Sequence, residues 1–256
     1  MTAALATVTV IRWILQLNKP KVLNMSKIIV GGVEKFSAVD FPGTLSAVVF
    51  MQGCPWRCPY CHNAVIQPIL KETDFSWELF FEFLKKRVGK LDAVTFSGGE
   101  PLVQDCLGKT MAEVKALGYK IGLHTGGYRP EALKKVLPLV DWVGFDVKAP
   151  FEADKYKKIT GTDQLNRVLE SLELLLKSGI DFECRTTCDP RFLSVEELWS
   201  IARSLKEKGV KKYFLQKYRP VEEDKTTSEA ECEALVSDKE LLNWCRQNFT
   251  EFEVRK

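Results

Sequence analysis

The sequence predicts an α/β protein built as a partial (β/α)6 open barrel with parallel strands. Apolar runs rich in β-branched residues alternate with helical patterns six times along the chain, which is typical of βα units around a parallel sheet. Six units are too few to close an eightfold barrel, and a flat, doubly wound sheet is the alternative. The chain has 256 residues, 45% of them hydrophobic, which is enough for one sizeable core.

Each expected element follows from its local pattern. Residues 45–53, "LSAVVFMQG", form a continuous apolar run and predict a buried strand. Ser76 precedes apolar residues at helical spacing and Gly89 follows them, which predicts a capped helix between the two. The same reasoning places the other strands at residues 91–101, 119–127, 141–150, 180–188 and 211–218. It places the remaining helices at residues 103–118, 130–140, 162–179, 194–209 and 238–248.

Unusual residues gather where the expected strands end. A loop with three cysteines follows the first strand, and "SGGEP" at residues 97–101 follows the second. "HTGG" at residues 124–127 ends the third strand, and "DVK" at residues 146–148 ends the fourth. Because the carboxyl ends of parallel strands meet at one edge of a sheet, we expect these motifs to share one site.

The chain ends and the overall charge limit the range of functions. Residues 1–24 are interpreted as an N-terminal extension, either upstream of a true start at Met25 or loosely docked, and residues 25–256 as one domain. The apolar part of the extension is too short and too interrupted to span a bilayer. The net charge of +3 indicates no nucleic-acid or membrane partner. The short basic runs at residues 85–87 and 155–158 are interpreted as solvated surface.

The eight cysteines are too sparse for a disulfide scaffold and favour a reducing, cytoplasmic compartment. Cys184 and Cys188 are interpreted as buried structural thiols. Cys54, Cys58 and Cys61 are close enough in sequence to bind a metal ion or a cluster. Structural zinc needs four ligands, and only the adjacent His62 offers a fourth. Three thiolates on a four-iron cluster leave one iron open for chemistry, so the missing fourth cysteine is informative.

These three cysteines carry a resemblance to a known family. With Tyr60 before the third, they match the CxxxCxφC signature of the radical S-adenosylmethionine (SAM) superfamily. The longer run "FPGTLSAVVFMQGCPWRCPYCHN" resembles the activating enzymes of glycyl radical enzymes, above all those of anaerobic ribonucleoside-triphosphate reductase. The resemblance covers about residues 36–220.

The resemblance implies a radical SAM enzyme with one [4Fe–4S] cluster held by the three cysteines. The open iron would bind the amino and carboxylate groups of SAM. An electron from a donor such as flavodoxin or ferredoxin would then cleave the sulfonium and give a 5′-deoxyadenosyl radical, which abstracts a hydrogen atom. The cofactors carry the demanding chemistry, and the protein binds and orients them.

The resemblance also implies roles for other residues at the strand ends. Gly98 and Gly99 would allow close backbone approach to SAM, and Glu100 would accept its ammonium group. Tyr60 would pack beside the adenine. Thr125 would help to organise the methionyl carboxylate, but His124 replaces an acid there and puts a monovalent-cation site in doubt.

Three further positions complete the expected cofactor site. Asp146 and Lys148 match a D-x-K pattern and would either pair with each other or face the carboxylate or substrate. Arg185 would clamp the carboxylate or pair with an acid. Gln216 would approach the ribose.

The expected partner is a glycyl radical enzyme, with the anaerobic reductase as the first candidate. A radical SAM enzyme acting on a small molecule, such as a carboxy-deazaguanine synthase, is the alternative. A zinc-stabilised binding protein is a third reading, and it leaves "SGGEP" and "DVK" unexplained.

Overall fold

The computed structural model describes residues 27–69, 72–220 and 226–256. The expected extension at residues 1–24 therefore lies outside the described residues. The eight strands found in these described ranges form one sheet in sequence order. They are β1 (Val30–Ser37), β2 (Ser46–Met51), β3 (Ala93–Gly98), β4 (Lys120–Thr125), β5 (Trp142–Asp146), β6 (Asp181–Cys188), β7 (Lys212–Lys217) and β8 (Glu251–Arg255).

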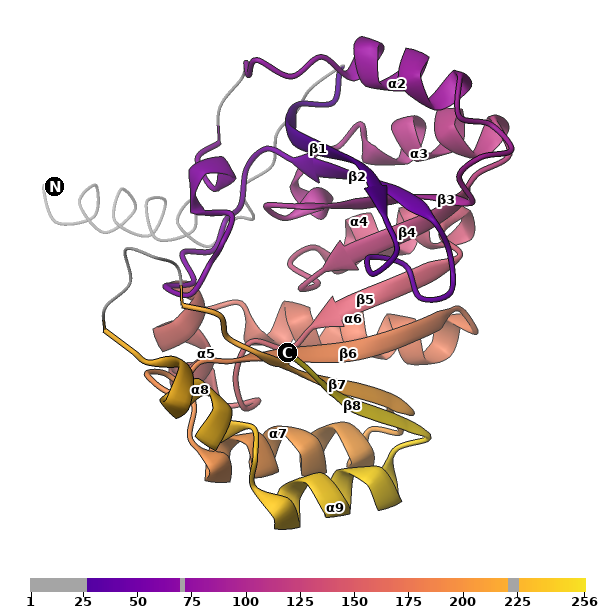
Figure 1. Ribbon diagram of the computed structural model, residues 1–256. Coiled ribbons are helices and arrows are strands. Elements are labelled where there is room, and N and C mark those ends of the chain that lie inside the picture. The colour runs from indigo at the N-terminus through magenta and orange to yellow at the C-terminus, as the bar shows by residue number, and fades with distance from the viewer. Residues whose placement is uncertain (1–26, 70–71, 221–225) are drawn as a thin grey trace, which may run out of the picture.

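Seven of these strands are parallel, and helices link them on one face. The connections from β2 to β8 are all parallel, whereas β1 pairs antiparallel with β2. Parallel crossovers are almost always right-handed, so a strand order that never reverses puts the helices on one side of the sheet. The sheet curves as an open barrel (Figure 1). The helices are α2 (Trp77–Lys85), α3 (Leu107–Ala116), α4 (Pro130–Val136), α5 (Ala153–Thr160), α6 (Leu165–Ser178), α7 (Val195–Glu207), α8 (Glu229–Leu235) and α9 (Lys239–Asn248).

The six expected strands are all present, which confirms the predicted partial barrel and rules out the doubly wound alternative. The edge strands β1 and β8 and the short helices α5 and α8 were not expected. Ser76 caps α2 by accepting the amide of Leu79, as expected, but the helix ends at Lys85, before Gly89. Gly89 instead adopts a positive φ of 75° in the following turn.

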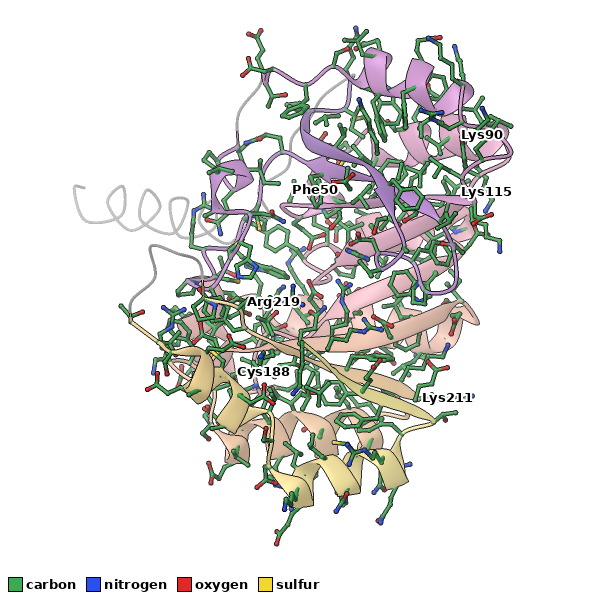
Figure 2. The ribbon with its side chains drawn as sticks, in the orientation of Figure 1. Phe50, Lys90, Lys115, Cys188, Lys211 and Arg219 are labelled. Carbon is green, nitrogen blue, oxygen red and sulfur yellow. The ribbon has the colours of Figure 1, made fainter. Side chains whose placement is uncertain are left out.

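The core lies inside the barrel and between the sheet and its helices. The end where the strands begin is closed by a separate small cluster of Phe41, Ala93 and Trp142. The rings of Phe41 and Trp142 stack with centroids 5.4 Å apart. Figure 2 shows Lys90, Lys115 and Lys211 at this end of the sheet, away from Arg219. The barrel is therefore plugged at one end and open at the other.

Within the described ranges, no helix is long and apolar enough to span a bilayer.

Candidate functional site

A cavity of about 1100 Å³ opens at the carboxyl ends of the strands. It brings together every residue that the sequence singled out for the cofactors, although these come from six different strands or strand ends. They are Cys54, Cys58, Tyr60, Cys61, Gly98, Gly99, Glu100, Thr125, Asp146, Lys148, Arg185 and Gln216. The structure thus confirms that the strand-end motifs share one place, while the role of each residue stays a prediction.

The cysteine loop is folded by its own backbone. After β2, the amides of Gly53 and Cys54 donate to the carbonyls of Ile66 and Gln67, at 2.8 and 2.9 Å, and so close the loop on itself. The ring of Trp56 then packs against Gly126, directly after β4, where an added Cβ atom would lie 2.1 Å from the ring. The loop is held over the cavity from two sides as a result.

The loop supplies three thiols to the cavity. The three thiols are free, and Cys54 and Cys58 are buried. In the described part of the chain, no three His, Cys, Asp or Glu side chains are grouped to hold a metal ion. A single zinc needs its sulfurs within about 4 Å of one another, since each Zn–S bond is about 2.3 Å. A four-iron cluster binds each thiolate at a different iron, which suits separated ligands.

One buried polar atom in the loop has no hydrogen-bond partner among the described residues. This atom is Trp56 Nε1, on a residue that lines the cavity. Buried polar groups are rarely left this way without a bound molecule. Burial, together with the nearby Glu100 carboxylate, raises the pKa of the Cys54 thiol to about 12. A bound cationic metal centre would offset both effects, so the residues fit a cluster.

His62, the possible fourth zinc ligand, has another contact. Its Nε2 lies 3.0 Å from the carbonyl oxygen of Arg219, and its ring lies 5.4 Å from that of Tyr218. The side chain therefore links the cysteine loop to the segment after β7.

Gly98 and Gly99 have a structural reason to be glycine. A Cβ atom on Gly98 would lie 2.2 Å from the amide nitrogen of Met51, and one on Gly99 would lie 2.2 Å from the carbonyl oxygen of Gly53. Backbone atoms cannot move aside cheaply, so the two glycines allow the end of β3 to pass against the start of the cysteine loop. The sequence reasoning expected close approach to a ligand, and the structure adds this backbone contact.

Glu100 is buried at the wall of the cavity with its carboxylate fully engaged. The Thr125 hydroxyl donates to it at 2.6 Å, the Gly126 amide at 2.9 Å and the Leu102 amide at 3.2 Å. Burial nevertheless raises the pKa of Glu100, because these neutral donors do not replace its lost hydration. A ligand ammonium placed beside Glu100 would supply the missing positive charge.

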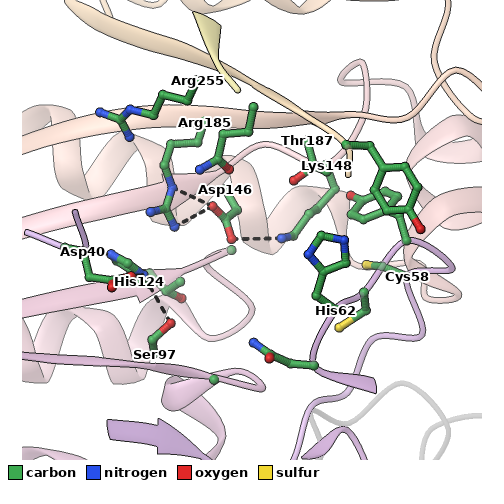
Figure 3. Close-up of a pocket in the computed structure, with 18 of the residues that line it drawn as sticks. Asp40, Cys58, His62, Ser97, His124, Asp146, Lys148, Arg185, Thr187 and Arg255 are labelled. Carbon is green, nitrogen blue, oxygen red and sulfur yellow. Dashed lines mark hydrogen bonds and ion pairs between the residues drawn. The ribbon is translucent and has the colours of Figure 1, made fainter. Parts of the chain in front are cut away.

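Asp146 pairs with both of the cations expected near it (Figure 3). Lys148 Nζ lies 2.9 Å from Oδ2, and Arg185 NH2 lies 2.8 Å from Oδ1. Although burial opposes it, the two cations hold the pKa of Asp146 well below its ordinary value. One carboxylate and two cations leave this group with a net positive charge that faces the cavity.

His124 is a buried hydrogen-bonding side chain at the floor of the cavity. Its Nε2 lies 2.8 Å from the carbonyl oxygen of Asp40, so Nε2 donates and Nδ1 accepts from the Ser97 hydroxyl at 3.2 Å (Figure 3). Burial, together with the positive charge of Arg185, lowers the pKa of His124 to about 3. This neutral imidazole connects the turn after β1 to β3 and β4, and both of its nitrogens are engaged.

The structure adds cavity residues that the sequence reasoning missed. Asp40 reaches the floor from the β1–β2 connection, and Arg255 reaches it from β8, where it pairs with the buried Glu183. The alternating pattern "EFEVR" at residues 251–255 is a strand signal that could have located Arg255. Trp56 had no such signal, because only the packing on Gly126 places it.

Comparisons with known proteins identify related enzymes. The model of the radical SAM superfamily matches residues 48–188. A putative glycyl-radical enzyme activating enzyme of Methanocaldococcus jannaschii is 33% identical over 204 residues, which are 76% of this chain and 81% of that protein. The pyruvate formate-lyase-activating enzyme of Clostridium pasteurianum is 34% identical over 134 residues, which are 50% of this chain and 56% of that protein. The chain thus spans a little over half of this second relative.

Solved structures share the fold at low sequence identity. SuiB of Streptococcus suis bound to S-adenosylmethionine superposes with a TM-score of 0.63 at 12% identity, over 80% of this chain and 48% of SuiB. The enzyme anSMEcpe with bound AdoMet superposes with a TM-score of 0.57 at 16% identity, over 78% of this chain and 60% of that one. By its fold, its superfamily match and its archaeal relative, the chain belongs to the radical SAM superfamily and, within it, to the glycyl-radical-enzyme activating enzymes.

Proposed function

We propose that this enzyme binds a [4Fe–4S] cluster and SAM in its cavity and installs a glycyl radical on a partner enzyme. The observation that carries the proposal is the convergence of the three cysteines and the nine other expected residues on one cavity. When bound, the cluster and SAM supply a 5′-deoxyadenosyl radical that removes a hydrogen atom from the target glycine.

Cys54, Cys58 and Cys61 would hold the cluster through three of its irons. Glu100 would accept the methionyl ammonium of SAM, and the net positive group around Asp146 would face its carboxylate. Tyr60, which is buried in the cysteine loop, would pack beside the adenine, and Gln216 on β7 would approach the ribose. These assignments would give the ammonium of SAM an acidic partner and its carboxylate a cationic partner in the same cavity.

The partner would present a glycine-bearing segment to the open side of the barrel. Our first candidate remains anaerobic ribonucleoside-triphosphate reductase, because of the sequence resemblance around the cysteine loop. Pyruvate formate-lyase is the second candidate, since its activating enzymes are among the relatives of this chain.

The test is anaerobic cleavage of SAM with matched cysteine variants. The protein is reconstituted with iron and sulfide, reduced with dithionite and supplied with SAM, and 5′-deoxyadenosine is quantified. The Cys58→Ala variant is expected to form none. Cys106→Ala is the control, because Cys106 lines a separate cavity beside α2 and α3 and should leave the reaction intact.

The same reaction identifies the partner. Anaerobic reductase and pyruvate formate-lyase are added separately, and a glycyl radical is sought by electron paramagnetic resonance. A zinc-loaded protein without iron, or full activity in Cys58→Ala, would contradict the cluster assignment. Deoxyadenosine without a radical on either protein would contradict these partners and leave the SAM reaction standing.

A further inference from the structure

A basic surface lies directly outside the cysteine loop. The short helix α5 ends at Thr160, and its last turn carries the exposed side chains of Lys157 and Lys158. The backbone amide of Arg57 donates to the carbonyl of Thr160 at 2.9 Å, and so joins the end of α5 to the loop between the first two cysteines. Figure 1 shows α5 beside this loop.

Arg57 brings its charge to the outer side of a cysteine. Its guanidinium NH1 donates to the carbonyls of Cys54 and Trp56, both at 2.7 Å. The side chain is nevertheless exposed, as is Pro59 beside Cys58. A positive charge and an apolar contact therefore lie at the protein surface within one or two residues of two expected cluster ligands.

Lys157 and Lys158 of α5 differ from Lys155 in their ion pairing. Lys155, on the same helix, pairs with Glu152 and Glu197. Lys157 and Lys158 form no ion pair within the described ranges, and the one acid on their exposed stripe is Asp154, a turn earlier. We had interpreted this basic run as solvated surface from the sequence alone. The hydrogen bond between Arg57 and Thr160 shows that this basic run lies next to the cysteine loop.

The other basic run of the sequence, at residues 85–87, lies away from the cysteine loop. Lys85 pairs with Glu82, and Arg87 lies over the ring of Phe83 at 5.2 Å. That run ends α2 near Lys90, at the closed end of the barrel (Figure 2). Of these two runs, only the one on α5 combines unpaired charge with closeness to the cysteines.

We propose that Arg57, Pro59, Lys157 and Lys158 form the docking surface for an acidic flavoprotein that delivers electrons to the cluster. The proposal rests on the proposed function, since it needs a cluster at the three cysteines. The edge of a flavin is apolar, and in an acidic carrier it is ringed by carboxylates. Pro59 would contact the apolar edge of the flavin, and the surrounding cations would face its ring of carboxylates. One electron passes from the reduced flavin to the cluster, so the carrier is oxidised by one electron and no bond in this chain forms or breaks.

The first test measures binding, with flavodoxin as the probe. The Lys157→Glu/Lys158→Glu variant of the reconstituted enzyme is compared with Lys134→Glu/Lys135→Glu. The control changes two exposed lysines in the last turn of α4, so it reverses the same number of charges. It also places acidic side chains at a helix C-terminus, where they destabilise the helix to a similar extent. We expect the α5 variant to bind flavodoxin at least about tenfold more weakly at low ionic strength, and the control to bind like the parent. The difference should shrink at about 0.5 M salt, where surface charges are screened.

The second test separates the docking surface from the chemistry. Deoxyadenosine formation is measured with reduced flavodoxin and, separately, with dithionite, which needs no docking site. The α5 variant should lose activity with flavodoxin only. If the parent is inactive even with dithionite, the proposed function fails, whatever the binding test shows.

Four results would overturn the docking proposal. Flavodoxin could bind the α5 variant as tightly as the parent, or both variants could lose affinity equally. Ferredoxin, but not flavodoxin, could bind in a manner that depends on Lys157 and Lys158, which would replace the flavin carrier by an iron–sulfur carrier. Glycyl radical formation driven by dithionite could fail in the α5 variant, which would assign the surface to the glycyl radical enzyme.

Discussion

Asp146 and Arg185 are register partners on the adjacent parallel strands β5 and β6, and Arg185 Nε lies 2.9 Å from Oδ1 of Asp146. The same carboxylate accepts Lys148 Nζ through its other oxygen. Two cations are therefore held side by side in the cavity by one acid, which the backbone register places between them. Removing the acid would leave two partly buried positive charges facing each other.

The Asp146→Asn substitution is expected to destabilise the fold. Because the side chains of Lys148 and Arg185 are only 16% and 9% exposed, losing their counter-charge should cost about 2 to 4 kcal/mol. Urea unfolding of the protein measures this change. Asp181→Asn is the control, since Asp181 is 58% exposed in its pair with Lys212 and should contribute below about 1 kcal/mol. Equal effects of the two substitutions would show that the Asp146 group is not a buried charge cluster.

Glu100→Gln is expected to weaken SAM binding. The change keeps the size of the side chain but removes the charge that would face the methionyl ammonium. Since a charge-assisted hydrogen bond contributes about 1.5 to 3 kcal/mol, the dissociation constant for SAM should rise about 10- to 100-fold. Calorimetry on the anaerobic, reconstituted enzyme measures it. Glu170→Gln, on the exposed face of α6, is the control, and an unchanged affinity in Glu100→Gln would remove Glu100 from the SAM site.

The sequence predicted the site better than it predicted the edges of the fold. Strands β2 to β7 are apolar because each lies between two neighbours and under helices, so their pattern is strong. Strands β1 and β8 each have one neighbour, and their exposed or half-exposed residues weaken the signal. The site was predictable because parallel strands bring their carboxyl ends to one edge, so motifs far apart in sequence meet there.

What the sequence could not provide are the partners of individual side chains. The choice of Arg185 between an acid and a ligand depends on the register of β5 and β6, which only the structure fixes. The contact between α5 and Arg57 joins segments about a hundred residues apart and has no sequence pattern. The role of His124 likewise depends on its hydrogen bonds with Asp40 and Ser97, which lie on other elements.

Gly99→Ala is expected to disturb the cysteine loop. Its Cβ would lie 2.2 Å from the carbonyl oxygen of Gly53, so the end of β3 and the loop would have to separate. We expect a loss of at least about 2 kcal/mol in the free energy of unfolding, together with less iron bound after reconstitution. Both quantities are measured on the same preparation.

Gly108→Ala provides the matched control with the opposite expected sign. Gly108 lies within α3, and the nearest atom to an added Cβ is a side-chain methyl of Val136 at 3.6 Å, which is an ordinary contact. Because alanine favours the helix, the variant should gain about 0.5 to 1 kcal/mol and keep its iron. If Gly99→Ala behaved like Gly108→Ala, the backbone contact between Gly99 and Gly53 would not be needed.

Because His124 is buried and neutral, the folded protein is expected to lose stability in mild acid. Burial lowers its pKa in the folded protein to about 3, below the ordinary value of 6.5. Between these values the unfolded chain binds a proton that the folded chain does not bind. The contribution of a neutral His124 is therefore complete above pH 6.5 and is lost as the pH falls toward 3.

The His124→Gln variant isolates this contribution. Glutamine retains a donor for the carbonyl of Asp40 but does not titrate. The free energy of unfolding of the parent should fall by about 2 kcal/mol more than that of His124→Gln between pH 7 and pH 5. Urea unfolding at several pH values, on protein without added iron, measures both curves. Parallel curves would mean that His124 is as easily protonated in the folded protein as in the unfolded chain, and that its two hydrogen bonds do not fix it as a neutral side chain.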